Sequence, residues 1–456
     1  MTWIGIDDTD SPRGGCTTFT LTEVIRAAAE NGFDLLGEPR LTRLNPNIPY
    51  KTRGNASLSA RFGHGLGKPR VIGDWGRAPV RSFRRGRTLE TKEARRLAEV
   101  AWGAVRNSAQ LGEEGTEPAM VVVSHRLPAA LYWNAVQRLV RLAPVERLLR
   151  THRAIVRSEG SRRGLVGAAA AVAWSGAHPT FELLAYRAPA RYGERRRLSS
   201  ASVRKVERRY PELFVCTDPT TRRVLVAPHT GCPILYGLRA SRPDRLIGIS
   251  HELQSETVAR RLLFRTNQGT GDHLARREVA DLRPYDAAIL SGTVAAPPEV
   301  RPGGHVAFDL VDRSGDRITC LAFEPTKTLP RLAASLRPGD VLRVWGGRAR
   351  DPTLRLEGVD LVATVPRLRA PPNPRCPTCG GRLHSLGTHR GFRCPRDGTR
   401  APPEARVPIE PETGPELGRY HPTPSARRHL HPRAPEPGRP GEGPVSWYVR
   451  RPRIDL

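Results

Sequence analysis

Lysine is scarce in this chain of 456 residues, although the chain is strongly basic. Only five of its 74 basic residues are lysines, and 45 acidic residues leave a formal net charge of +29. An excess of this size points to a polyanionic partner, most simply a nucleic acid. Arginine suits bidentate phosphate contacts and stacking on bases, and a biased genomic base composition would give the same skew.

Cysteine is also rare, and long apolar runs are missing. The seven cysteines are odd in number and mostly scattered, which argues against a disulfide framework. The most conspicuous apolar run, residues 165–174, is far too short to span a membrane, and no N-terminal signal sequence is seen. We therefore expect a soluble, cytoplasmic protein of three or four domains, without a membrane partner or an evident obligate protein partner.

Three carboxylates follow a short buried strand that we predict at residues 3–6. They are Asp7, Asp8 and Asp10. Repulsion makes such a cluster unfavourable unless a cation or a solvated loop relieves it. Because Mg²⁺ is commonly held by one or two carboxylates together with substrate phosphates, Asp7 and Asp8 are candidate magnesium ligands.

A loop of small residues connects the carboxylates to a helix predicted at residues 20–29. Glycines let backbone N–H groups approach phosphate oxygens, and a helix N-terminus favours anions. Strand, acidic loop and helix together indicate a site for a metal ion and a nucleoside triphosphate. The alternative is an acidic surface turn that caps a helix, because the loop is not a Walker motif. The candidate phosphate-binding residues of this loop are Ser11, Arg13, Gly14, Gly15 and Thr17.

A second turn rich in glycine and arginine, residues 160–164, precedes an alanine-rich helix. Its Arg163 and Gly164 suit an anion at the helix N-terminus, and a tight turn that packs small residues is the alternative. Residues 39–55 are expected to form an extended loop, because two X-Pro steps disfavour a helix. Lys51 and Arg53 in this loop can neutralise phosphate, unless they are ordinary surface charges.

These stretches resemble one family of enzymes. Residues 6–18 (Ile-Asp-Asp-Thr-Asp-Ser-Pro-Arg-Gly-Gly-Cys-Thr-Thr) are similar to the opening of archaeal tRNA-isoleucine 2-agmatinylcytidine synthetase (TiaS). Residues 43–55 (Arg-Leu-Asn-Pro-Asn-Ile-Pro-Tyr-Lys-Thr-Arg-Gly-Asn) resemble a second motif of that family. Further similar stretches follow in family order near residues 164–168, 228–239, 264–274 and 425–430.

The resemblance implies an ATP-dependent ligase that acts on an isoleucine tRNA with a CAU anticodon. ATP phosphorylates the C2 oxygen of the wobble cytidine, and the primary amine of agmatine displaces the phosphate, so that the anticodon reads AUA. The resemblance further implies catalytic roles for Asp7, Asp8, Asp10 and Thr18, with Thr18 phosphorylated by the enzyme itself. It also implies RNA contacts by Asn45, Lys51 and Arg53.

Two alternatives stay open. Thr18 can instead be the N-cap of the first helix, since threonine is favoured there. The whole protein can instead be a non-catalytic RNA-binding protein whose acidic loop holds a structural ion.

We expect a multi-domain α+β protein. An N-terminal α/β kinase-like domain (residues 1–155) and a ferredoxin-like domain (156–282) precede a domain of five short strands (283–368). A helix between its third and fourth strands gives the order of an OB-fold barrel, which often binds nucleic acid. A zinc ribbon (369–402) and a largely irregular Pro/Arg-rich tail (403–456) follow. Residues 63–87 are predicted to form a loop, and residues 128–142 a helix.

The ribbon contains an incomplete set of zinc ligands. Cys376 and Cys379 form a Cys-x-x-Cys pair, but the second half has Cys394 and then Asp397. Three thiolates and one carboxylate can hold Zn²⁺, although aspartate is unusual in structural sites. His384 or His389 can replace Asp397, and a metal-free ribbon is the alternative.

Overall fold

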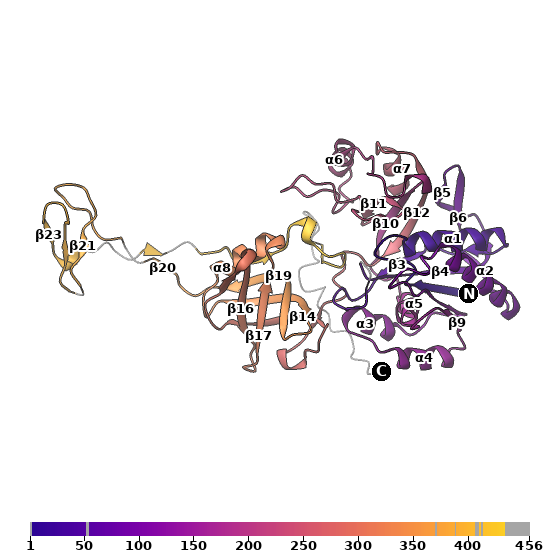
Figure 1. Cartoon of the computed structure of the whole chain (residues 1–456), viewed down its shortest axis with the longest axis horizontal. Coiled ribbons are helices and arrows are strands. Elements are labelled where there is room, and N and C mark those ends of the chain that lie inside the picture. The colour runs from indigo at the N-terminus through magenta and orange to yellow at the C-terminus, as the bar shows by residue number, and fades with distance from the viewer. Residues whose placement is uncertain are drawn as a thin grey trace.

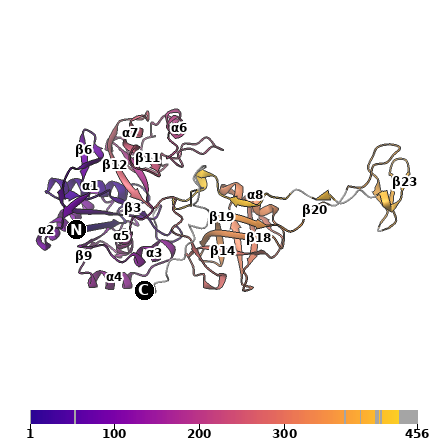
Figure 2. The ribbon, with the colours of Figure 1, turned by 180° about the vertical axis from the view of Figure 1, so that it is seen from behind.

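The computed structural model describes residues 2–51, 54–369, 372–387, 389–405, 410–411 and 414–433. A large N-terminal α/β part lies beside a β-barrel, and a small ribbon lies beyond the barrel (Figure 1). The view from behind shows the same order of parts (Figure 2). The predicted multi-domain organisation with mixed α and β structure is therefore confirmed. Among the described residues, no helix is long and apolar enough to cross a bilayer.

One sheet of 12 strands forms the N-terminal part, with the main order β11-β10-β12-β3-β4-β1-β8-β9. β1 lies inside this sheet and pairs antiparallel with both β4 and β8. The sheet contains strands from both sides of residue 155, where we expected the first domain to end. β3 of the first part pairs with β12 of the second through Arg40 and Arg265. The strands of the main path are β1 (Thr2–Asp7), β3 (Arg40–Arg43), β4 (Ala56–Leu66), β8 (Ala119–Val123), β9 (Ile155–Ser158), β10 (Thr180–Arg187), β11 (Ile234–Ala240) and β12 (Val258–Thr266).

Alternate residues of β1 face opposite sides of the sheet, as the pleat requires. Ile4 and Ile6 pack under α1 (Thr17–Glu30) and α2 (Thr91–Ser108). Trp3 faces α5 (Gly164–Ala173), which packs on β1 and β4 with α3 (Ala129–Gln137) and α4 (Leu142–Thr151) behind it. Gly5 lets α5 approach, because a Cβ there would lie 2.1 Å from the carbonyl oxygen of Ala168.

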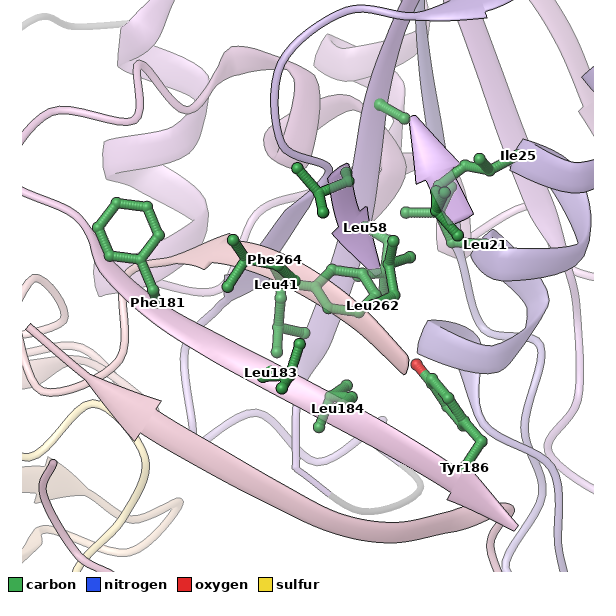
Figure 3. Packing of buried hydrophobic residues seen from close by; sticks show 14 of the residues in the cluster. Leu21, Ile25, Leu41, Leu58, Phe181, Leu183, Leu184, Tyr186, Leu262 and Phe264 are labelled. Carbon is green, nitrogen blue, oxygen red and sulfur yellow. The ribbon is translucent and has the colours of Figure 1, made fainter. Parts of the chain in front are cut away.

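The core under α1 extends across the junction between the two halves of the sheet. Leu41 and Leu58 of the first half and Leu183 and Phe264 of the second belong to one buried cluster. Figure 3 shows Leu21 and Ile25 of α1 near the same cluster, together with Leu184, Tyr186 and Leu262. The second half also contains α6 (Ser200–Arg209) and α7 (Leu246–His251).

The predicted loop at residues 63–87 is wrong. β4 runs to residue 66, and β5 (Arg70–Trp75), β6 (Ala78–Ser82) and β7 (Arg85–Arg87) follow it, with β2 (Asp34–Leu35) paired to β4. Glycine suggested a loop, but here it permits close pairing of strands. A Cβ on Gly73 would lie 2.1 Å from the carbonyl oxygen of Arg261 in the neighbouring strand.

The predicted helices differ from the structure at two places. The first helix begins at Thr17 rather than residue 20, with Cys16 as its N-cap. The helix predicted at 128–142 ends earlier, because Arg138 is extended (φ −142°, ψ 171°) and ends α3, and α4 begins only at Leu142.

The predicted five-stranded barrel is confirmed. Its strands enclose a separate core that includes Leu290, Phe308, Leu342 and Leu354. Pairing of β14 with both β16 and β18 closes the barrel, and β17 pairs in parallel with β19. The strands are β14 (Ala287–Val294), β16 (His305–Val311), β17 (Arg317–Ala322), β18 (Val341–Arg348) and β19 (Thr353–Ala363), and α8 (Thr328–Ser335) lies between the third and the fourth. Short strands β13 (Ala275–Arg276) and β15 (Glu299–Arg301) extend the sheet.

Beyond the barrel, β20 (Leu368–Arg369) pairs with β24 (Glu410–Pro411), and the ribbon sheet consists of β21 (His384–Ser385), β22 (Phe392–Arg393) and β23 (Arg400–Ala401). The chain then comes back as residues 414–433, which we call the return segment. Its β25 (Gly418–Tyr420) pairs with β19, and Leu430 is buried in the cluster that contains Trp3 and Trp174. Part of the predicted irregular tail therefore ties the barrel to the N-terminal part. Residues 434–456 lie outside the described residues.

Candidate active site

A cavity of about 1310 Å³ lies at the carboxyl end of β1, between the two halves of the sheet and the return segment. Many of the residues predicted from the sequence line it. They are Asp7, Asp8, Asp10, Thr17, Thr18, Lys51, Arg163 and Gly164. The fold therefore gathers both predicted anion-binding turns and the acidic loop in one place.

The carboxylate of Asp7 is pressed against α5. A Cβ on Gly167 would lie 1.9 Å from Oδ2 of Asp7 and 2.3 Å from Oγ of Ser57, so only glycine leaves room for the carboxylate. Burial, and then the charge of Asp8, raise the pKa of Asp7 well above its ordinary value.

The next carboxylate, Asp8, has a left-handed backbone (φ 59°). Burial, followed by the charges of Asp10 and Glu117, raises its pKa to about 7. Glu117 was not predicted. It lies just before β8, and the antiparallel pairing of Asp7 with Ala119 brings it to the site. Only the pairing of two strands far apart in the sequence could have identified it.

This acidic cluster (Asp7, Asp8, Asp10 and Glu117) suits a divalent cation, which would relieve the repulsion that, after burial, raises the pKa values of Asp7 and Asp8. In the part of the chain that the structure describes, only the ribbon brings three or more candidate ligand atoms within 4.8 Å of one another. The acidic cluster is therefore more open than an all-protein cage. It fits a Mg²⁺ ion that takes the rest of its ligands from phosphates and water.

The N-terminus of α5 lies next to the acidic cluster. A Cβ on Gly164 would lie 3.3 Å from Cβ of Asp8 and 2.9 Å from Cβ of Ala119. Arg163, the residue before the helix, stacks over Tyr50 with 3.9 Å between its guanidinium carbon and the ring centre. The helix dipole and this guanidinium supply positive charge beside the acidic cluster, which would suit a phosphate group.

Four residues of the first loop that we predicted to bind phosphate do not line the cavity: Ser11, Arg13, Gly14 and Gly15. The hydroxyl of Ser11 accepts hydrogen bonds from the N–H groups of Arg13 and Gly14, each at 3.1 Å. Arg13 is exposed and forms an ion pair with Glu113 at 3.4 Å. Gly15 has a φ of +71°, which few other residues adopt. These residues build the turn that leads into α1.

Thr18 lies inside the first turn of α1, so its interpretation as the N-cap is wrong. The N-cap is Cys16, and no side chain caps the helix. The Thr18 hydroxyl lies 3.0 Å from Sγ of Cys16, and both residues line the cavity with Thr17. Of the two interpretations of Thr18, the role as phosphate acceptor stays a prediction.

The three residues predicted to contact RNA have different environments. Lys51 is exposed and lines the cavity. Asn45 is buried, its amide donates to the carbonyl oxygen of Tyr285 at 2.9 Å, and its Oδ1 accepts from the N–H of Asn47 at 2.9 Å. Asn45 therefore joins this loop to the barrel instead of facing a ligand. Arg53 lies outside the described residues.

A second group of polar residues in the cavity was not predicted. Arg43, Glu182, Arg239, Gln268 and His429 all line it. Burial lowers the pKa of Arg43 to about 10, so its guanidinium remains charged at neutral pH. The stretches around Gln268 and His429 stand out in the sequence only by their similarity to family motifs, because nothing in the local sequence links residues so far apart.

The ribbon brings together the predicted zinc ligands. Sγ of Cys376 lies 3.3 Å from Oδ2 of Asp397, and Sγ of Cys379 lies 3.5 Å from Sγ of Cys394. The N–H of Thr399 donates to Asp397 at 2.9 Å and orients the carboxylate. The cluster of four candidate ligands does not include His384 or His389. Three thiols and an oriented carboxylate fit zinc.

Comparison with known proteins agrees with this geometry. The family model described as the TiaS TCKD domain matches residues 3–158, the TiaS FLD domain matches 162–273, and the TiaS C-terminal zinc ribbon domain matches 373–411. The chain is 34% identical over 433 residues to the isoleucine-tRNA 2-agmatinylcytidine synthetase TiaS of Archaeoglobus fulgidus, and the match covers 94% of this chain and 96% of the relative. It is 34% identical over 446 residues to the enzyme of the same name from Methanopyrus kandleri, with 94% and 96% covered.

Solved structures give the same result. The crystal structure of TiaS in complex with its isoleucine tRNA and ATP superposes with a TM-score of 0.78 at 32% identity, covering 94% of this chain and 95% of the other. The complex of TiaS with the same tRNA, AMPCPP and agmatine gives 0.76 at 29% identity, with 94% and 96% covered. Identity of this extent over nearly the whole length, together with three matched family domains, shows that this chain belongs to the TiaS family.

Proposed function

We propose that this chain is an ATP-dependent isoleucine-tRNA 2-agmatinylcytidine synthetase, which joins agmatine to C2 of the wobble cytidine. The relatives of the same name and the tRNA, ATP and agmatine complexes support this function. The observation that carries it is the cavity that unites the acidic cluster, the N-terminus of α5 and the first turn of α1. A structural ion would account for the carboxylates alone, but not for a helix N-terminus and the first turn of α1 in the same cavity.

In this proposal Asp7 and Asp8 would hold Mg²⁺, with Asp10 and Glu117 close by. The ion would neutralise charge on the triphosphate and on the transferred phosphoryl group. Arg163 and the N–H groups that begin α5 at Gly164 bind phosphate oxygens. Phosphoryl transfer depends mainly on such positioning and charge stabilisation, so these residues account for the first half of the reaction. Thr18, which lines the same cavity, would accept a phosphoryl group there.

The cytidine must leave its stack to enter the cavity, as in other enzymes that modify a base. Lys51, Arg427 and Arg428 line the cavity and offer positive charge to the RNA backbone around it. We assign a kinase-like role to residues 1–155, a ferredoxin-like fold to 156–282 and an OB-fold to 283–368, followed by the ribbon at 369–402 and the tail at 403–456. A tRNA with a CAU anticodon as substrate and the cytoplasm as the place of action remain predictions.

Zinc in the ribbon is the second metal of the proposal. Cys376, Cys379, Cys394 and Asp397 would hold it, and the ion would fix a sheet of only three short strands with a very small core. The ribbon would then offer a rigid basic surface to the tRNA.

Mass spectrometry of tRNA nucleosides tests the function. Isoleucine tRNA with a CAU anticodon is incubated with the protein, ATP and agmatine, then digested. We expect a cytidine heavier by agmatine minus water, which is absent when ATP, agmatine or protein is omitted. A transcript with uridine at the wobble position is the matched control. An unmodified cytidine in the complete reaction would support the RNA-binding alternative.

A further inference from the structure

Three side chains from distant parts of the sequence form a hydrogen-bonded chain that ends in the cavity. Glu182 on β10 is buried and pairs with Nε of Arg239 at 3.0 Å. The amide nitrogen of Gln268 donates to the other carboxylate oxygen of Glu182. The amide oxygen of Gln268 lies 3.0 Å from Nδ1 of His429. The site described above gives no role to this series of hydrogen bonds.

This series of hydrogen bonds determines which nitrogen of His429 carries the proton. A carboxylate that pairs with arginine only accepts hydrogen bonds, so Gln268 must turn its NH₂ group toward Glu182. Its carbonyl oxygen then faces His429, and a carbonyl only accepts, so Nδ1 of His429 must be the donor. In a neutral imidazole the other nitrogen, Nε2, therefore carries a free electron pair.

The surroundings of His429 keep it neutral. Its ring is exposed to the cavity but surrounded by protein. This loss of bulk solvation, together with the charges of Arg43 and Arg239, holds its pKa well below the ordinary value of histidine. No described residue donates a hydrogen bond to Nε2 in this structure. The imidazole is therefore neutral, and its Nε2 is an acceptor position that no described side chain uses.

The backbone holds His429 firmly in place. Its carbonyl oxygen accepts from the N–H of Gly269 at 2.8 Å, and the next carbonyl, of Leu430, accepts from Gly271 at 2.9 Å. The ring packs close to Gly54, where an added Cβ would lie 3.6 Å from Nε2 of His429 and 3.0 Å from Nη1 of Arg43. Burial lowers the pKa of Arg43, and the negative charge of Asp10 opposes this shift. His429 thus lies near Arg43, a cation that interacts with Asp10 of the acidic cluster.

We infer that His429 is the proton acceptor in the second half of the proposed reaction, with Gln268 and Glu182 as positioning residues, an inference that rests on the proposed function. The unprotonated primary amine of agmatine bonds to C2 with the electron pair of its nitrogen. The bond between C2 and the phosphorylated oxygen breaks, and phosphate leaves with that bond's electron pair. The attacking nitrogen gives one proton to Nε2 of His429, and the imidazolium passes it to the released phosphate.

The test separates the two halves of the reaction in the full-length protein. H429N retains an N–H near the position of Nδ1 that can donate to Gln268, but it has no base. We expect H429N to transfer phosphate from γ-labelled ATP to the tRNA cytidine within about threefold of the parent rate. Incorporation of labelled agmatine should fall by about 100-fold or more, as for other lost general bases. H125N, which alters a histidine outside the cavity, is the matched control and should resemble the parent.

A second variant guards against a folding artefact. H429A leaves space for a small base, so added imidazole should restore part of the agmatine incorporation in H429A but not in the parent. Agmatine incorporation by H429N at the parent rate would overturn the inference. Loss of both steps in H429N, or no recovery of H429A with imidazole, would show a structural role and overturn it too. Failure of the parent itself to make the product would instead overturn the proposed function and, with it, this inference.

Discussion

The carboxylate of Asp7 occupies the space in which a side chain at Gly167 would stand, 1.9 Å from the position of a Cβ. The acidic end of β1 can therefore pack against helix α5 only because residue 167 is glycine. A change at position 167 acts on the site without removing any group that carries chemistry.

Gly167→Ala should push Asp7 from its place. We expect the rate of ATP-dependent tRNA modification to fall by at least about tenfold and the free energy of unfolding to fall by about 1–3 kcal/mol, as for other overpacked sites. Gly103→Ala is the matched control, because Gly103 lies in helix α2 with no atom within 4 Å of an added Cβ. In Gly103→Ala the free energy of unfolding should rise by about 0.5–1 kcal/mol, and the activity should be unchanged. An active Gly167→Ala enzyme would contradict the close fit.

Asp7→Asn removes one charge with little change of shape. It should abolish ATP-dependent modification, while the affinity for tRNA, measured by filter binding, stays within about twofold because the basic surface is unchanged. Since burial and Asp8 already raise the pKa of Asp7, the variant should fold at least as well as the parent without added Mg²⁺. Near-normal product formation would rule out Asp7 as a metal ligand.

Thr18→Val keeps the shape of a buried side chain and removes only its hydroxyl. If Thr18 accepts phosphate, the variant should retain the circular dichroism spectrum of the parent but lose the label from γ-labelled ATP when tRNA is omitted. Thr17→Val is the comparison, because both hydroxyls line the cavity. A label that persists in Thr18→Val and disappears in Thr17→Val would move the acceptor to Thr17.

Metal analysis of the purified protein should find about one zinc per chain. Asp397→Ala should release the ion at a lower chelator concentration than the parent, because only the three thiolates remain. His384→Ala is the control and should retain zinc as the parent does, since His384 is not part of the ligand cluster. A zinc-free protein that still modifies tRNA would show that the ribbon works without metal.

Acid should loosen the contact between the barrel, the N-terminal part and the return segment. Burial opposes ionisation of Glu357, but His273 and Arg428 hold its pKa at about 2, and His273 lies 2.9 Å away. Burial lowers the pKa of His431 to about 3. In both cases the unfolded chain binds more protons, so stability falls as the pH decreases, below about 6.5 for His431 and below about 4.5 for Glu357.

Thermal unfolding measured at pH 7 and at pH 5 checks this sign. The parent should lose stability between the two values, and His431→Gln should lose less, because it removes one group that gains a proton on unfolding. An equal loss in both proteins would contradict the assignment of the effect to His431.

Local pattern was enough to predict the barrel, β1 and the acidic loop, since alternation of apolar residues and a run of carboxylates are visible in a few adjacent residues. The hairpin of β5 and β6 was missed because Gly73 serves a contact with β12, nearly two hundred residues away. Glu117 and His429 reach the cavity only through strand pairing and through the return segment. Asn45 has the residue type of an RNA contact, yet burial against Tyr285 decides its use.

The return segment also sets an order in time. Residues 414–433 leave the ribosome after the sheet, the barrel and the ribbon, yet they supply one wall of the cavity and its histidine. A nascent chain can complete the acidic cluster and the phosphate-binding turns long before that wall exists. Synthesis itself would thus withhold the amine-transfer step until the return segment has been made, so a nascent chain without that segment could bind nucleotide without joining agmatine to any RNA.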